Sequence, residues 1–233
     1  MLRRNVLVLA SGTSTGGGSG AWNLGRAVEQ GILRANIVGI VSQYPDGGTR
    51  EMAMRLEYPF FHFPPPWTAA RYQELMKKTR AEFYILSGWN QLVRGLDPSK
   101  TINKHPAPLP EYGGRGWWGY TVHERMIQAY RLGEVQCSAV TFHFVIEAGA
   151  KEQSYDKGPI ICTQDVPILA GDTADDLSRR VRAAEYLLEP LIVNQVITEK
   201  IRWSGNVSES VHIPRGFLVR RPVELLEDPR LIF

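Results

Sequence analysis

At 233 residues, the chain has the length of one α/β domain with short appendages, and its 43% hydrophobic and 22% charged residues indicate a folded protein rather than a disordered one. The formal charge of +3 is small and the basic residues are scattered, with a cluster (Arg215, Arg220, Arg221) only in the C-terminal tail, which argues against nucleic acid as a partner. Because no run of about 18 apolar residues is present, a membrane is not an expected partner either.

The first half of the chain alternates predicted strands with predicted helices. Continuous apolar runs rich in β-branched residues predict buried strands over residues 6–10, 37–42, 58–63 and 83–87. Helices are expected over residues 22–30, 49–56 and 68–80, the last with Thr68 as its N-cap. This order predicts βαβ units, and therefore a Rossmann-like α/β fold with a mostly parallel, twisted sheet flanked by helices.

The second half has a different pattern. Residues 101–119 are dense in proline and glycine and are expected to form a loop. Further elements are predicted as a helix over 122–131, strands over 138–147 and 159–167, and a long helix over 173–199 that Pro190 should kink or restart. We expect one domain over residues 1–200, with residues 201–233 as an extension that packs on its surface.

The cysteine content and the N-terminal sequence indicate the cellular compartment. Cys137 and Cys162 are too few for a disulfide framework and lack zinc spacing, so they are expected as small buried side chains and no metal site is predicted. The apolar stretch near the start is only about five residues long and runs into a glycine-rich loop, so it is interpreted as a strand rather than a signal peptide. A cytoplasmic enzyme is the expectation.

A glycine-rich segment follows the first predicted strand. Residues 11–20 contain five glycines and precede a helix N-terminus at the carboxyl end of a strand, where backbone N–H groups can cradle a phosphate. No Gly-Lys-Ser/Thr follows, which excludes a P-loop, and the spacing does not fit a dinucleotide fingerprint. A loop that needs glycine only for its turns is the alternative.

A second candidate site lies in the proline-rich stretch. Asn103 and His105 are two residues apart, so in extended backbone their side chains leave the same face. A carboxamide N–H and an imidazole that converge on one point can stabilise an oxyanion, and the imidazole can also transfer a proton. A histidine in a loop is also commonly a surface or packing residue, so this pair alone does not establish a site.

An acid and a further histidine complete the candidates. Asp156 lies on a turn just before a predicted strand, and a carboxylate beside His105 would raise the pKa of the imidazole. An Asx turn is the alternative role for this aspartate. His143, on the predicted strand 138–147, is equally well a fourth member of the site or a core histidine.

Together these segments resemble the folate-dependent formyltransferases from residue 6 to about residue 193. The order and spacing of the motifs carry the resemblance, rather than any single one. The motifs are Leu9-Ala10-Ser11-Gly12, Leu86-Ser87-Gly88-Trp89, Asn103-Lys104-His105-Pro106 with Leu109-Pro110, Val122-His123, His143-Phe144-Val145, Tyr155-Asp156-Lys157-Gly158-Pro159-Ile160 and Val166-Pro167-Ile168-Leu169-Ala170-Gly171-Asp172-Thr173.

Within that family the resemblance is greatest to the phosphoribosylglycinamide (GAR) formyltransferases of purine biosynthesis. It implies an enzyme that uses 10-formyltetrahydrofolate as co-substrate and no metal. Asn103 and protonated His105 would stabilise the oxyanion of a tetrahedral intermediate, while Asp156 keeps His105 charged and helps to relay the proton. The resemblance also implies contacts to three substrate groups: to the acceptor phosphate by Gly18, Ser19, Gly20 and Asn23, to the acceptor amine by Glu185, and to the folate by Gln91, Leu92 and Val93.

Several departures from the family pattern leave alternatives open. The loops at residues 11–20, 113–119 and 145–156 are longer than usual, the last in a stretch that closes over the folate in the family, and Asn90 replaces a usually apolar residue. A sugar-nucleotide N-formyltransferase, a formyltetrahydrofolate hydrolase or a non-catalytic folate-binding homologue would share the fold. A hydrolase is expected to have an extra N-terminal domain, and a methionyl-tRNA formyltransferase a larger C-terminal one, which disfavours both. Small-molecule substrates and a monomer or homodimer are expected.

Overall fold

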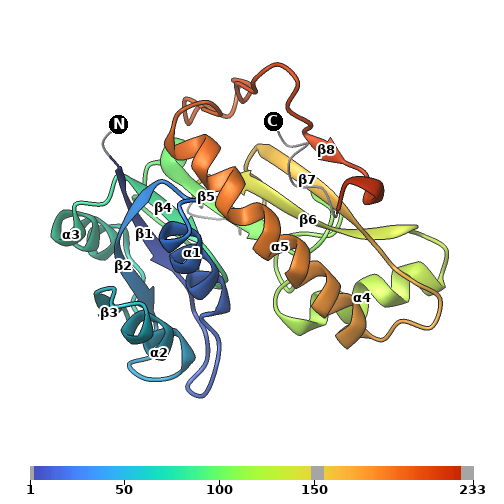
Figure 1. Cartoon of the computed structure of the whole chain (residues 1–233), viewed down its shortest axis with the longest axis horizontal. Coiled ribbons are helices and arrows are strands. Elements are labelled where there is room, and N and C mark those ends of the chain that lie inside the picture. Colours follow the sequence, from blue (N-terminus) through green and yellow to red (C-terminus); the bar gives the residue numbers. More distant parts are fainter. Residues whose placement is uncertain (1–2, 148–154, 227–233) are drawn as a thin grey trace.

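A computed structural model describes residues 3–147 and 155–226, so most of the long loop between residues 145 and 156 lies outside the described residues. The eight strands of its sheet are β1 (Arg4–Leu9), β2 (Ala35–Ser42), β3 (Phe60–His62), β4 (Phe83–Leu86), β5 (Thr101–His105), β6 (Cys137–Phe144), β7 (Ile160–Pro167) and β8 (Arg220–Arg221). They lie in the order β3-β2-β1-β4-β5-β6-β7-β8 (Figure 1). The first five strands are parallel and β6 is antiparallel to both its neighbours, which confirms the mostly parallel sheet.

Helices flank this sheet and bury both of its faces. They are α1 (Ser19–Glu29), α2 (Gly48–Arg55), α3 (Ala69–Thr79), α4 (Tyr120–Arg131) and α5 (Ala174–Ile197). Val6 and Val8 of β1 join the core beneath α1, α4 and α5, whereas Leu7 and Leu9 join the core beneath α3. This alternation explains why the buried residues 6–9 of β1 are all apolar. In the described part of the chain, no helix is long and apolar enough to span a membrane.

Strand β5 was not predicted, because residues 101–119 looked like one continuous loop. It pairs in parallel with β4 and antiparallel with β6, so it lies where the sheet changes direction. Ile102 is the only apolar residue of β5, so the sequence lacks the apolar run by which the other buried strands were predicted. Asn103 and His105 are therefore held by a ladder of hydrogen bonds in the interior of the sheet, which fixes their positions more firmly than a proline-rich loop would.

Helix α5 runs through Pro190 as one helix, so of the kink or restart that we predicted there, the restart does not occur. Proline has no backbone N–H, so the carbonyl four residues earlier, on Tyr186, loses its partner within the helix. The side-chain amide of Asn23 in α1 donates to this carbonyl at 3.0 Å. A side chain from the neighbouring helix thus replaces the missing bond and ties α1 to α5.

Replacing Asn23 with alanine is therefore expected to lower the free energy of unfolding by about 1–2 kcal/mol, since it leaves a partly buried carbonyl unsatisfied. The measurement is a denaturant titration of the parent and the Asn23→Ala variant. Asn36→Ala is the matched control, because the Asn36 amide donates to Asn5 at an exposed position; we expect a change within about 0.5 kcal/mol. Equal stability of the parent and Asn23→Ala would contradict this role.

Residues 201–226 are part of the folded domain. Trp203 and Phe217 join the core beneath α5, and β8 extends the sheet beyond β7. The basic cluster predicted for the tail is partly engaged within the protein. Arg220 forms an ion pair with Asp165 at 2.9 Å, and the buried Arg221 donates to the side chain of Gln164.

Candidate active site

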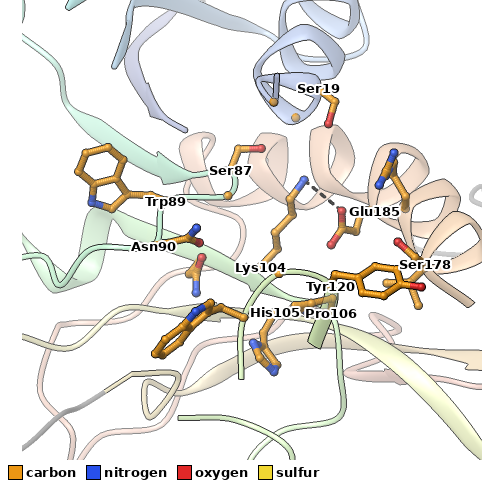
Figure 2. A pocket seen from close by; sticks show the side chains of 18 of the residues that line it. Ser19, Ser87, Trp89, Asn90, Lys104, His105, Pro106, Tyr120, Ser178 and Glu185 are labelled. Atoms are coloured by element: carbon orange, nitrogen blue, oxygen red, sulfur yellow. Dashed lines mark ion pairs between the residues drawn. The ribbon is translucent and has the colours of Figure 1, made fainter. Parts of the chain in front are cut away.

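A cavity of about 500 Å³ lies at the carboxyl ends of β1, β4 and β5. It is lined by the glycine-rich loop with the first turn of α1, by residues 117–120, and by α4 and α5. Figure 2 shows side chains from these segments around it, among them Ser19, Tyr120 and Glu185. Asn103, His105 and Asp156 line it, together with Glu185. The predicted position, at the carboxyl edge of a parallel sheet, is where this fold class binds its ligands.

The structure brings together the three side chains predicted to carry the chemistry, and His143 with them. Asp156 Oδ2 is 3.5 Å from His105 Nδ1, and Asp156 Oδ1 is 3.2 Å from Asn103 Nδ2. His143 lies opposite Asn103 in the β5–β6 ladder, with Nε2 3.1 Å from Asn103 Nδ2 and 3.5 Å from Asp156 Oδ1. Of the two alternatives for His143, the structure places it in this cluster, although it is also 1% exposed and so buried.

The hydrogen bonds of His105 identify its titrating nitrogen. Nε2 is 2.7 Å from the carbonyl oxygen of Tyr112, which can only accept, so Nε2 carries a proton and Nδ1 titrates toward Asp156. Burial lowers the pKa of His105 below its usual value, and the opposing effects of Asp156 and Tyr112 do not offset it. We predicted a raised pKa, but the imidazole is neutral at neutral pH because burial has the larger effect.

Asp156 is held as a carboxylate. Burial favours its neutral form, but the hydrogen bond from His143, the two nearby imidazoles and the Gly114 N–H at 3.1 Å together lower the pKa of the carboxyl below its usual value. Its backbone has φ 57°, a left-handed conformation that aspartate tolerates better than most residues. Gly158 fixes the same turn, since a Cβ there would lie 1.7 Å from the carbonyl oxygen of Phe144.

Two of the four residues predicted to bind phosphate face the cavity. Ser19 and Gly20 line it at the N-terminus of α1, where no side chain caps the helix. Gly18 packs instead against the start of α2, since a Cβ on it would lie 2.6 Å from Thr49 Cα. Asn23 also lies outside the lining and supports Tyr186. A phosphate could therefore approach the backbone N–H groups at Ser19 and Gly20.

The residues predicted to bind folate lie next to Asn103 and Asp156, on the side away from the large cavity. Gln91, Leu92 and Val93 line a small cavity of about 40 Å³, whose lining also includes Asn103, His143, Tyr155 and Asp156. This volume is about that of one water molecule in the liquid, so a pterin ring requires the cavity to open. Asn103 and Asp156 thus lie between a large cavity and a small one, and a group that reacts between two substrates would occupy this position.

Two further polar side chains in the large cavity, Lys104 and His123, were not predicted from the sequence. Lys104 forms ion pairs with Glu189 and Glu185, at 2.6 and 3.6 Å. Burial, then Arg182 and His105, lower the pKa of His123 to about 4, and its Nδ1 has no hydrogen-bond partner among the described residues. Lys104 and His123 belong to motifs that carry the family resemblance, but only the packing of α5 against β5 and against α4 reveals where their side chains point. Among residues 3–147 and 155–226, no group of three or more His, Cys, Asp or Glu could hold a metal ion.

Comparisons with known proteins identify relatives for most of the chain. The family model described as formyl transferase matches residues 4–193. A chloroplastic phosphoribosylglycinamide formyltransferase of Arabidopsis thaliana is 28% identical over 212 residues, which are 86% of this chain and 68% of that protein. The Vigna unguiculata enzyme of the same name is also 28% identical, but the chain spans only 63% of its length. A crystal structure of glycinamide ribonucleotide transformylase 1 from Symbiobacterium toebii superposes with a TM-score of 0.74 at 26% identity and covers 91% of this chain and 94% of that one.

Proposed function

This chain belongs to the formyl transferase family, and we propose that it transfers the formyl group of 10-formyltetrahydrofolate to the primary amine of GAR. The observation that carries the proposal is the position of Asn103, His105 and Asp156. They meet where two cavities adjoin. The large cavity reaches the glycine-rich loop, which is predicted to bind phosphate, and the small cavity is lined by the predicted folate contacts. The names of the relatives support the same acceptor.

The acceptor fits the large cavity by its chemistry. Its phosphate would lie at the N-terminus of α1, near Ser19 and Gly20, where backbone N–H groups and the helix dipole favour an anion. Arg182, on α5, lines the same cavity and adds a positive charge. Glu185, one turn further along α5, would accept a hydrogen bond from the amine and keep it near the reacting carbon.

The three central residues would then act on the formyl group. The amine nitrogen attacks the formyl carbon, and the carbonyl oxygen becomes an oxyanion. Asn103 Nδ2 would stabilise that oxyanion after it exchanges one of its present partners, Asp156 or His143, for the substrate oxygen. The fraction of His105 that is protonated at Nδ1 would donate that proton to the folate nitrogen as the C–N bond to folate breaks, and His105 would regain a proton from the amine nitrogen, which loses one. The Asp156 carboxylate would stabilise this imidazolium.

A turnover assay tests the proposal. The protein is mixed with GAR and a 10-formyl folate analogue whose absorbance changes on deformylation, and the rate is compared with water alone and with an amino-sugar nucleotide as acceptor. We expect deformylation that depends on GAR. Release in water alone would favour a hydrolase, transfer only to the sugar nucleotide would favour that acceptor, and folate binding without any product would favour a non-catalytic homologue.

Expectations about substrate size, compartment, oligomeric state and partners rest on the sequence alone. We propose that the enzyme acts on small molecules in the cytoplasm, as a monomer or a homodimer, with neither nucleic acid nor membrane as a partner. The term chloroplastic in the names of the plant relatives applies to those proteins. Size-exclusion chromatography with light scattering distinguishes the two oligomeric states, and fractionation of cells that produce the protein tests the compartment.

A further inference from the structure

A buried cation lies between two carboxylates in the wall of the large cavity. The ammonium of Lys104 is 2.6 Å from Glu189 Oε2 and 3.6 Å from Glu185 Oε2. Both acids belong to α5 and are four residues apart, so they lie on the same face of the helix. Figure 2 shows Lys104 extending from β5 toward Glu185, with Ser87 and Ser19 above it.

The three side chains are not equivalent. The side chain of Glu189 is 1% exposed and that of Lys104 is 7% exposed, whereas that of Glu185 is 16% exposed and lines the cavity. The shorter contact is with the more buried acid. Glu189 therefore fixes the ammonium, and the ammonium in turn contacts an acid that is still open to a ligand.

Lys104 also lies beneath the first turn of α1. A Cβ on Gly20 would be 3.2 Å from Lys104 Nζ and 2.0 Å from Ser87 Oγ, so only glycine allows α1 to approach this closely. Burial lowers the pKa of Lys104, but Glu189 and Glu185 outweigh it and hold the pKa above its usual value. The side chain is therefore an ammonium ion at neutral pH. Tyr186 on α5 also raises the pKa of Lys104, and Glu185 in turn raises that of His105 on β5.

We propose that Lys104 is a positioning residue for the acceptor: fixed by Glu189, it holds the Glu185 carboxylate aimed into the cavity, where that carboxylate binds the attacking amine. This inference rests on the proposed function, because it assigns the neighbours of Glu185 a role in acceptor affinity. Without the ammonium, Glu185 would lose the partner that orients it and would be free to turn away from the amine.

A purely structural role for Lys104 makes a different prediction. A buried ion pair contributes little net stability, and apolar residues of similar size often replace it without loss. If Lys104 served only to neutralise Glu189, removal of both charges together would leave the acceptor site intact. The double variant Lys104→Leu/Glu189→Leu separates the two roles, because it removes the ammonium from Glu185 without leaving an unpaired charge in the core.

The experiment measures steady-state kinetics with each substrate varied in turn, with calorimetry of GAR binding. For the double variant we expect the KM for GAR and its dissociation constant to rise about 10-fold or more, as for a lost hydrogen bond to a charged group. The KM for the formyl folate analogue should stay within about two-fold, since Lys104 does not line the small cavity. A double variant with the KM for GAR of the parent would overturn the inference.

A second variant guards against loss of the fold. Lys104→Gln/Glu189→Gln keeps a hydrogen-bonded pair of similar size without charge, and the same rise in the KM for GAR is expected. If either double variant folds and binds GAR as tightly as the parent does, Lys104 is not a positioning residue. A parent that neither binds nor formylates GAR would overturn the proposed acceptor, and this inference with it. An active parent with unimpaired double variants overturns the inference alone.

Discussion

Replacing Asp156 with asparagine is expected to lower kcat by roughly 10³- to 10⁴-fold, comparable to the loss of a carboxylate that orients a catalytic histidine elsewhere. The structural reason is the 3.5 Å contact between Asp156 Oδ2 and His105 Nδ1. The carboxylate raises the pKa of His105, although burial lowers it overall. Its removal lowers that pKa further, so an even smaller fraction of the imidazole carries a proton at neutral pH.

The direction of the pH dependence follows from the same contact. In the parent, the His105 pKa lies below its usual value, so the protonated form is lost as pH rises through that pKa. In Asp156→Asn the loss is expected at lower pH. The measurement is single-turnover formyl transfer between pH 5 and 9, with circular dichroism and thermal unfolding to confirm the fold.

Asp165→Asn is the matched control for Asp156→Asn. Asp165 is also an aspartate with a strong ion-pair partner, but that partner is Arg220 at the sheet edge, outside the lining of either central cavity. We expect the kcat of this control to stay within about two-fold of the parent value, because surface ion pairs contribute little to stability. A rate for Asp156→Asn close to that of the parent would show that Asp156 does not assist His105.

The fold was largely predictable because its signals are local. The continuous apolar runs of β1, β2 and β4 and the N-cap Thr68 lie where the sequence predicted them. β5 was missed because pairing on both sides makes it a strand, whereas only Ile102 marks it in the sequence. The continuity of α5 could not be predicted either, since the residue that compensates for Pro190 is Asn23, more than 160 positions away.

The candidate site was likewise predictable only in part. Asn103, His105 and Asp156 were predicted as a group from motif order, and the structure places them within hydrogen-bond or ion-pair distance. The pKa of His105 was predicted in the wrong direction, because burial depends on the whole core and not on the nearest charge. Lys104 was overlooked although it stands between Asn103 and His105, since strand alternation sends it to the face that α5 covers.

The second large effect is expected for His105→Gln, which should lower kcat by roughly 10²- to 10⁴-fold, the usual range for loss of general acid–base catalysis. Glutamine retains a hydrogen-bond donor but has no nitrogen that titrates. The pH profile of this variant should therefore be flat where the parent loses activity. His212→Gln is the control, because His212 is exposed and lies outside both central cavities.

A double variant tests whether the two residues act as one. If Asp156 works through His105, the Asp156→Asn/His105→Gln variant should be slower than His105→Gln by no more than a few-fold, since residues of one catalytic unit have non-additive effects. Multiplied losses in the double variant would instead mean that Asp156 acts on the substrate independently. In that case the 3.5 Å contact between carboxylate and imidazole would be only structural.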